Sequence, residues 1–163
     1  MNADDVLAYG HRAVLDAVDG LSHAAWEAPG TCGVWSVKDI LAHLASYEFL
    51  LVDACAPYLG GGPTPYLDAL LTRGETFNDA QVAQRRDQSA AETLIAYTQA
   101  QECAASLVAR IPVTERRQAG RLGWYGADYD LEDLITYMFY GHKREHCAQI
   151  VAVRDRLGAA PTG

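Results

Sequence analysis

The sequence predicts an all-α protein, an up-down four-helix bundle with a long crossover between its second and third helices. Apolar residues recur at helical spacing in four long segments, and capping residues precede three of them. No segment shows the alternating apolar and polar pattern of a half-buried strand. At 163 residues, half of them hydrophobic, the chain is long enough for one domain with a sizeable core. We therefore expect one bundle over residues 1–157 and a flexible tail over residues 158–163.

The first long helix is expected from about Ala3 to Val18. Its apolar residues fall on one side at helical spacing, and they are Val6, Leu7, Val14, Leu15 and Val18. Gly20 supplies a stop signal, and Ser22 can cap a short turn after it.

The second long helix is expected after a loop at residues 28–33. Ser36 is its predicted N-cap, and Asp39 three residues later completes an arrangement like a capping box. The inner face consists of Val37, Ile40, Leu41, Leu44, Tyr47 and Leu51. This stretch is the most apolar in the chain, but it contains ionisable residues and ends near a proline. We therefore expect a buried helix and no membrane span.

A long crossover should follow, because glycines and prolines at residues 60–65 interrupt the helical pattern. Within it, residues 66–71 and 78–86 look like short helical pieces, and we expect this connection to form the rim of a site.

The last two long helices are also marked by capping residues. The third opens at Ser89, with Glu92 three residues on, and runs to about residue 111. The fourth opens at Asp130, again with an acidic residue three positions on, and continues to about Leu157.

Two histidines one helical turn apart, His142 and His146, lie on the fourth predicted helix, and His43 lies on the second. Side chains at i and i+4 project from one helix face, and a bundle can deliver a third ligand from another helix. The pair also falls in an apolar stripe formed by Leu131, Leu134, Ile135, Met138, Ile150, Val153 and Leu157. Buried imidazoles need partners for both ring nitrogens, and a metal ion on one nitrogen meets that need. The alternative is that these histidines are solvated or satisfied without metal.

Residues near the three histidines in sequence are candidates to orient them, namely Gln149, Tyr47 and Glu48. For Gln149, on the inner face, contact with a ligand or an imidazole is as expected as no such contact. Glu48 and Glu145 are more typical of exposed charges, and Tyr47 of a core residue.

Other residues are weaker candidates for a functional site. His11, on the apolar side of the first helix, is the main rival ligand, whereas His23 follows a cap and should be solvated. Five aromatic residues gather near the start of the fourth helix, and we interpret them as core packing rather than a pocket wall: Trp124, Tyr125, Tyr129, Tyr137 and Tyr140.

The composition of the chain restricts its expected binding partners and its expected cellular compartment. A net charge of −8 argues against nucleic acid, because phosphate binding needs a basic surface. The acidic amino terminus is unlike a signal or transit peptide, so we expect a cytoplasmic protein. The four cysteines form no Cys-x2-Cys pair and should remain thiols there.

Two segments resemble signatures of the DinB/YfiT-like four-helix-bundle proteins. Trp35-Ser-Val-Lys-Asp-Ile-Leu-Ala-His-Leu-Ala-Ser-Tyr-Glu48 resembles their second-helix signature, and Gly141-His-x3-His-x2-Gln-Ile150 resembles their fourth. Phe77-Asn78, Arg85-Arg86 and Leu122-Gly-Trp-Tyr-Gly126 look most like the ClbS/DfsB branch of that superfamily.

The resemblance implies that His43, His142 and His146 bind a divalent metal, usually zinc or nickel, with iron as a third option. It also implies several reactions, among them thiol transfer with a low-molecular-weight thiol, isomerisation and protection against reactive small molecules. A homodimer is compatible with it.

Three imidazoles leave a divalent ion an open position, at which a water or thiol becomes a nucleophile at neutral pH. We therefore predict a metal-dependent enzyme that hydrolyses a reactive small molecule or transfers a thiol to it, in stress or toxin protection. The alternative is a non-catalytic bundle that binds a small molecule or a metal. A third option is a helical dimer with buried, metal-free histidines.

Overall fold

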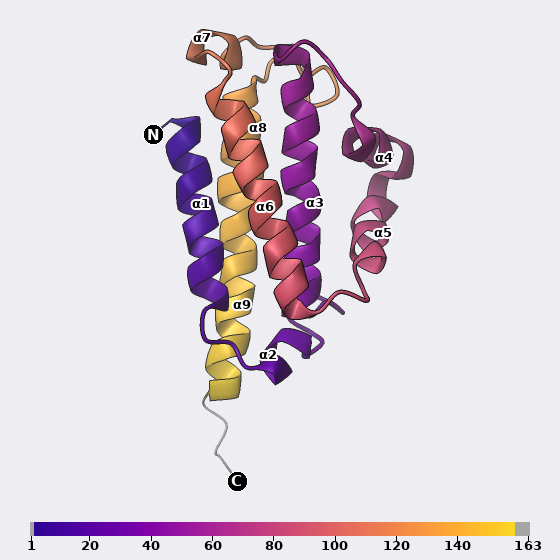
Figure 1. Cartoon of the computed structure of the whole chain (residues 1–163), viewed down its shortest axis with the longest axis vertical. Coiled ribbons are helices and arrows are strands. Elements are labelled where there is room, and N and C mark those ends of the chain that lie inside the picture. Colours follow the sequence, from indigo (N-terminus) through magenta and orange to yellow (C-terminus); the bar gives the residue numbers. More distant parts are fainter. Residues whose placement is uncertain (1, 159–163) are drawn as a thin grey trace.

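The computed structural model describes residues 2–158, and these residues fold into helices without a strand. Four long helical columns lie side by side (Figure 1): α1 (Ala3–Val18), α3 (Val37–Cys55), α6 (Ala90–Ala109), and α8 (Leu131–Thr136) continued by α9 (His142–Gly158). The predicted all-α bundle is confirmed. Gly158, assigned to the tail by the sequence, ends α9, and the rest of that tail lies outside the described residues.

The crossover between α3 and α6 sets the directions of the helices. Figure 1 shows α1 and α9 running in one direction and α3 and α6 in the other. Two short helices, α4 (Pro65–Arg73) and α5 (Phe77–Gln84), return the chain along the outer side of α3, so α6 starts at the same end as α3. Outside the fourth column, the remaining short elements are α2 (His23–Glu27), η1 (Ala56–Tyr58), η2 (Gly74–Thr76) and α7 (Val113–Arg116).

Side-chain caps begin the helices at the predicted places. Three capping boxes form, at Ser36, Ser89 and Asp130. Helix α4 has no side-chain cap of its own. Instead, Oδ2 of Asp53, on α3, accepts hydrogen bonds from the backbone nitrogens of Tyr66 at 2.6 Å and Leu67 at 2.9 Å. A carboxylate from the neighbouring helix thus satisfies the free N–H groups at the start of α4 and fixes it against α3.

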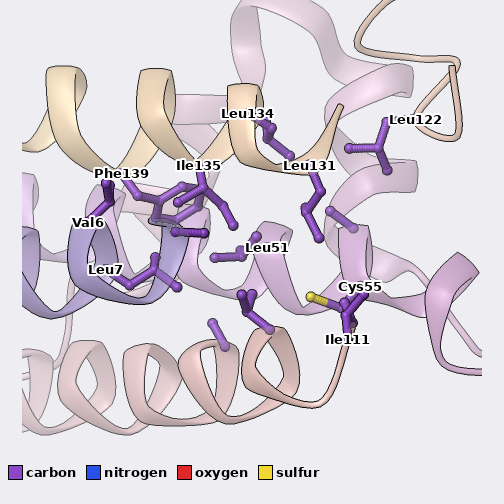
Figure 2. Close-up of a cluster of buried hydrophobic side chains, with 14 residues drawn as sticks. Val6, Leu7, Leu51, Cys55, Ile111, Leu122, Leu131, Leu134, Ile135 and Phe139 are labelled. Carbon is purple, nitrogen blue, oxygen red and sulfur yellow. The ribbon is translucent and has the colours of Figure 1, made fainter. Parts of the chain in front are cut away.

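The core extends along the bundle as two clusters of buried side chains. In Figure 2, Leu7 of α1, Leu51 of α3 and Ile135 of α8 belong to the first cluster. The second, at the other end, includes Ile40 of α3 and Ile150 of α9. Burial of this apolar surface is the main force that holds the columns together.

Helix α3 is buried on nearly every face, because α4 and α5 cover the side that points away from the bundle. The segment Val37–Tyr58 is the one described stretch long and apolar enough to cross a membrane, and most of it is buried inside the protein. It is therefore a buried central helix of the bundle, as the sequence predicted.

The fourth column contains a π-helical turn, η3 (Tyr137–Gly141), which the sequence analysis did not predict. A π-helical turn closes i→i+5 hydrogen bonds and rotates the following residues relative to a regular α-helix. Phe139 and Lys143, each 1% exposed, therefore occupy the core positions that the predicted stripe assigned to Met138 and His142. The rotation leaves His142 half-buried at the edge of the core.

Gly10 of α1 lets this turn approach closely, so Gly10→Ala should destabilise the protein. An added Cβ would overlap the carbonyl oxygen of Phe139 and lie 3.2 Å from Cδ of Lys143. We expect a loss of about 1–3 kcal/mol in the free energy of unfolding, measured in urea. In the matched variant Gly141→Ala, the Cβ enters open space, and stability should be unchanged or rise by up to about 1 kcal/mol. Equal effects of the two substitutions would contradict the close approach.

Candidate metal centre

Three histidines from two helices converge inside the bundle. His43 comes from α3, and His142 and His146 come from the first turns of α9. Nε2 of His142 lies 3.0 Å from Nε2 of His43 and 3.0 Å from Nε2 of His146. Within residues 2–158, this triad is the one group of His, Cys, Asp or Glu whose ligand atoms are placed to hold a metal ion, all within 4.8 Å of one another.

These distances fit a shared divalent ion. Nitrogens about 2.0–2.1 Å from a zinc ion lie about 3.3 Å from one another at tetrahedral angles. Nε2 of His142 has two close nitrogen neighbours, and its single proton or lone pair can serve only one of them well. An ion accounts for both contacts, and a set of imidazole nitrogens suits zinc, nickel or iron.

Burial keeps the imidazoles in the neutral form that binds metal. Desolvation, and then the nearby His142 and His146, lower the pKa of His43 to about 2. Desolvation and His146 lower the pKa of His142 to about 4. Burial also lowers the pKa of His146, although its hydrogen bond with Gln149 opposes the change. At neutral pH each ring therefore has an unprotonated nitrogen.

Gln149 selects which nitrogen of His146 is unprotonated. Nδ1 of His146 lies 2.8 Å from Oε1 of Gln149, and an amide oxygen can only accept, so Nδ1 carries the proton. Nε2 is then free and points toward the other two imidazoles. The sequence had left open whether Gln149 makes any contact with a ligand or an imidazole, and the structure places it against the imidazole of His146.

Replacing Gln149 with Leu should weaken metal binding by about 10- to 100-fold, because the ring and its tautomer would no longer be held. Gln149→Glu keeps an acceptor for the same N–H and should retain most of the affinity. Competition with a chelator of known affinity would measure both variants. A Leu variant that binds metal as tightly as the wild type would contradict the orienting role.

Two aromatic residues pack against the triad. The ring centroid of Tyr47 lies 4.8 Å from that of His43 and 5.1 Å from that of His142. Its hydroxyl donates to Oδ1 of Asn78, on α5, at 3.3 Å, so the crossover does approach the site. Trp35, whose ring lies 5.1 Å from that of His43, was not singled out as a neighbour, although the second-helix signature begins with it.

Glu48 has a different environment from the one expected. It is fully buried and pairs with the equally buried ammonium of Lys143, linking α3 to α9. Burial raises the pKa of Glu48, and Lys143 opposes that increase. The structure shows no contact between this carboxylate and the triad within the described residues. Lys143 was missed altogether, because a lysine between charged neighbours is typical of a solvated face.

The rival histidines lie apart from the triad. Nδ1 of His11 is 3.4 Å from the hydroxyl of Tyr97, and the ring lines a separate groove between α1 and α6. His23 is exposed, as predicted, and so is Glu145.

One hollow reaches the triad, and a second shares lining residues with the first. The inner hollow, of about 310 Å³, reaches His142 and is lined by Tyr47, Tyr137, Met138, Gly141, His142 and Glu145. The outer one, of about 670 Å³, is lined by Tyr125, Tyr129, Asp133, Thr136, Tyr137, Tyr140 and Gly141, and we call it the tyrosine groove. Tyr129 is 52% exposed and Tyr137 is 68% exposed. The prediction that this aromatic cluster packs in the core is therefore wrong for these two residues.

Comparison with known families matches residues 7–133 to the family described as the mycothiol maleylpyruvate isomerase N-terminal domain. The matched range is well over half of the chain. It includes His43 and ends before His142 and His146. No curated protein and no solved structure matches the chain.

Proposed function

The chain belongs to the family of the mycothiol maleylpyruvate isomerase N-terminal domain, a DinB/YfiT-like domain, and from this membership we propose that it is a metal-dependent enzyme acting on a reactive small molecule. The observation that carries the proposal is the convergence of three neutral imidazoles, two buried and one half-buried, beside an open hollow. The family description names a thiol, which favours transfer of a low-molecular-weight thiol over hydrolysis.

His43, His142 and His146 are the proposed ligands, with zinc or nickel as the preferred ion and iron as the third option. When bound, a divalent ion at three imidazoles supplies a Lewis acid with a free coordination position, where the pKa of a thiol or water falls toward neutral. Gln149 keeps the proton of His146 on Nδ1.

The residues around the triad define how a reactant approaches it. Trp35 and Tyr47 pack against His43, which is 2% exposed. His142 is less buried and lines the inner hollow. A reactant would therefore approach through the inner hollow and meet the triad at His142. The charged residues that line the two hollows are carboxylates, so the maleylpyruvate of the family's name is not part of this proposal.

The proposed setting is the cytoplasm, where the four free thiols of the chain stay reduced. The proposed role is protection against stress or a toxin, and the ClbS/DfsB branch is the subfamily we propose, on the segments quoted above. Neither nucleic acid nor membrane belongs to the proposal, and a homodimer is compatible with it.

Cobalt-substituted protein tests the proposal, because thiolate coordination adds a sulfur-to-cobalt absorption band. We expect mycothiol to produce that band. We also expect the metal-loaded protein to accelerate the reaction of mycothiol with 1-chloro-2,4-dinitrobenzene. His43→Ala should show neither effect. Thiol binding without any acceleration for a range of electrophiles would support a non-catalytic binding protein instead. Wild type and variant behaving alike in both measurements would overturn the proposal.

A further inference from the structure

We propose that the tyrosine groove and the inner hollow together bind the organic part of the substrate, and that they select neutral or cationic aromatic compounds over anionic ones. This inference rests on the proposed function and specifies the substrate class of the same site. It is carried by the lining residues that the two hollows share, their exposed aromatic rings and the sign of their charged residues.

The π-helical turn joins the two hollows. Tyr137 and Gly141, at its two ends, line both of them, and His142 follows directly. Phe139, between them, is buried in the core, so one turn both anchors the column and forms the wall shared by the hollows. A ligand that passes over the shared residues Tyr137 and Gly141 would reach from the tyrosine groove to His142.

The aromatic rings of the groove are available to a ligand. Tyr129 and Tyr137 expose more than half of their surface, and the rings of Tyr125 and Tyr129 lie 5.3 Å apart at 56°. Tilted rings at this spacing offer faces and edges against which another flat ring can pack. A contiguous exposed aromatic surface beside a candidate reactive centre is typical of a binding groove.

The charged residues in the lining are both acidic. Glu145 lines the inner hollow and Asp133 lines the tyrosine groove, while no lysine or arginine among the described residues lines either one. An anionic ligand would lose water here without gaining a counter-charge, which is unfavourable. A cation can instead lie over tyrosine faces near the two carboxylates.

The neighbouring basic residues contact other side chains of the protein. The guanidinium carbon of Arg144 lies 5.3 Å from the ring centroid of Tyr140, against one side of that ring. Lys143 is buried against Glu48. Arg117 Nε is 2.8 Å from Oε2 of Glu132. Lys143 and Arg117 are thus paired with carboxylates, and Arg144 stays on the Tyr140 ring, outside the residues that line the hollows.

Three probes with one ring and different charges test the inference: (2-naphthylmethyl)trimethylammonium, 2-naphthalenemethanol and naphthalene-2-sulfonate. Neither charged probe is a strong metal ligand, so their binding reports on the groove. By calorimetry with metal-loaded protein, we expect the cation and the alcohol to bind with a Kd about tenfold lower than the sulfonate. Equal or tighter binding of the sulfonate would overturn the proposal.

Substitutions in the two hollows test whether the probes bind there. Tyr137→Ala should raise the Kd of the cation and the alcohol by about tenfold, and Tyr137→Phe should restore most of the binding. Glu145→Lys should remove the preference for the cation. Leu71→Ala, at an exposed apolar position on α4, is the matched control and should bind like the wild type. If Tyr137→Ala also binds like the wild type while folded, the groove assignment is wrong.

Metal analysis of the wild type, set beside the measurements with the three probes, separates this inference from the proposed function. If the wild type holds no metal but still selects probes by charge through Tyr137, the proposed function is contradicted and the groove inference is supported. If the protein shows the metal and thiol chemistry but binds the three probes without preference, only the groove inference is contradicted.

Discussion

His146→Ala should lose its metal ion and, with it, the metal-dependent part of its stability. The substitution removes one of three Nε2 donors and leaves two imidazoles. For an ion that binds only the folded state, free metal at 1,000 times the Kd adds about 4 kcal/mol to the free energy of unfolding. In a chain of this length that increment corresponds to a rise of about 8–16 °C in Tm. We expect that rise in the wild type and its absence in the variant.

The comparison must use the rise in Tm that added metal produces in each protein. His146 is only 6% exposed, so its replacement can also weaken the metal-free fold. Elemental analysis of untagged protein gives the second readout, with about one ion per chain expected in the wild type and none in the variant. His11→Ala and His23→Ala are matched controls that should keep the ion, since neither residue belongs to the triad. Loss of the ion in His11→Ala, or its retention in His146→Ala, would show that the triad is not the binding site.

Helix starts could be predicted from the sequence because capping depends on residues within one turn. Ser36, Ser89 and Asp130 each form the expected box with an acidic residue three positions on. The π-helical turn could not be predicted in this way. It lies where Phe139 approaches Gly10, a residue of another helix, and a local hydrophobic pattern contains no information about that contact.

The histidine triad could also be predicted from the sequence, whereas the environment of the residues around it could not. Spacing placed His142 and His146 on one helix face and His43 on the inner face of another predicted helix, and the family resemblance joined the three as ligands. Lys143 and Glu48 carried no such signal, because each is hydrophilic and each is buried only through its partner on another helix. Tyr137 was assigned to the core because an aromatic residue next to apolar ones usually packs there, whereas the altered register of the π turn leaves it 68% exposed.

Lys143→Met should destabilise the fold by about 3–5 kcal/mol, because it leaves the carboxylate of Glu48 buried without a counter-charge. The ammonium of Lys143 also lies 5.4 Å from the ring centroid of Tyr97 and 5.6 Å from that of Phe139, so its replacement alters a packed site. Urea unfolding of metal-free protein would measure the loss separately from metal binding. The double variant Lys143→Met/Glu48→Leu removes both charges and should recover most of the lost stability.

The pH dependence separates the unpaired charge from lost packing in the Lys143→Met variant. Burial raises the pKa of Glu48, and without Lys143 that pKa should rise further. A carboxyl group whose pKa is higher in the folded than in the unfolded chain contributes stability at acidic pH, and this contribution is lost as pH rises through the folded value. The single variant should therefore be closest to the wild type in mild acid and weakest at neutral pH. A deficit that is independent of pH, and that the double variant does not repair, would assign the loss to packing around Tyr97 and Phe139 rather than to the charge of Glu48.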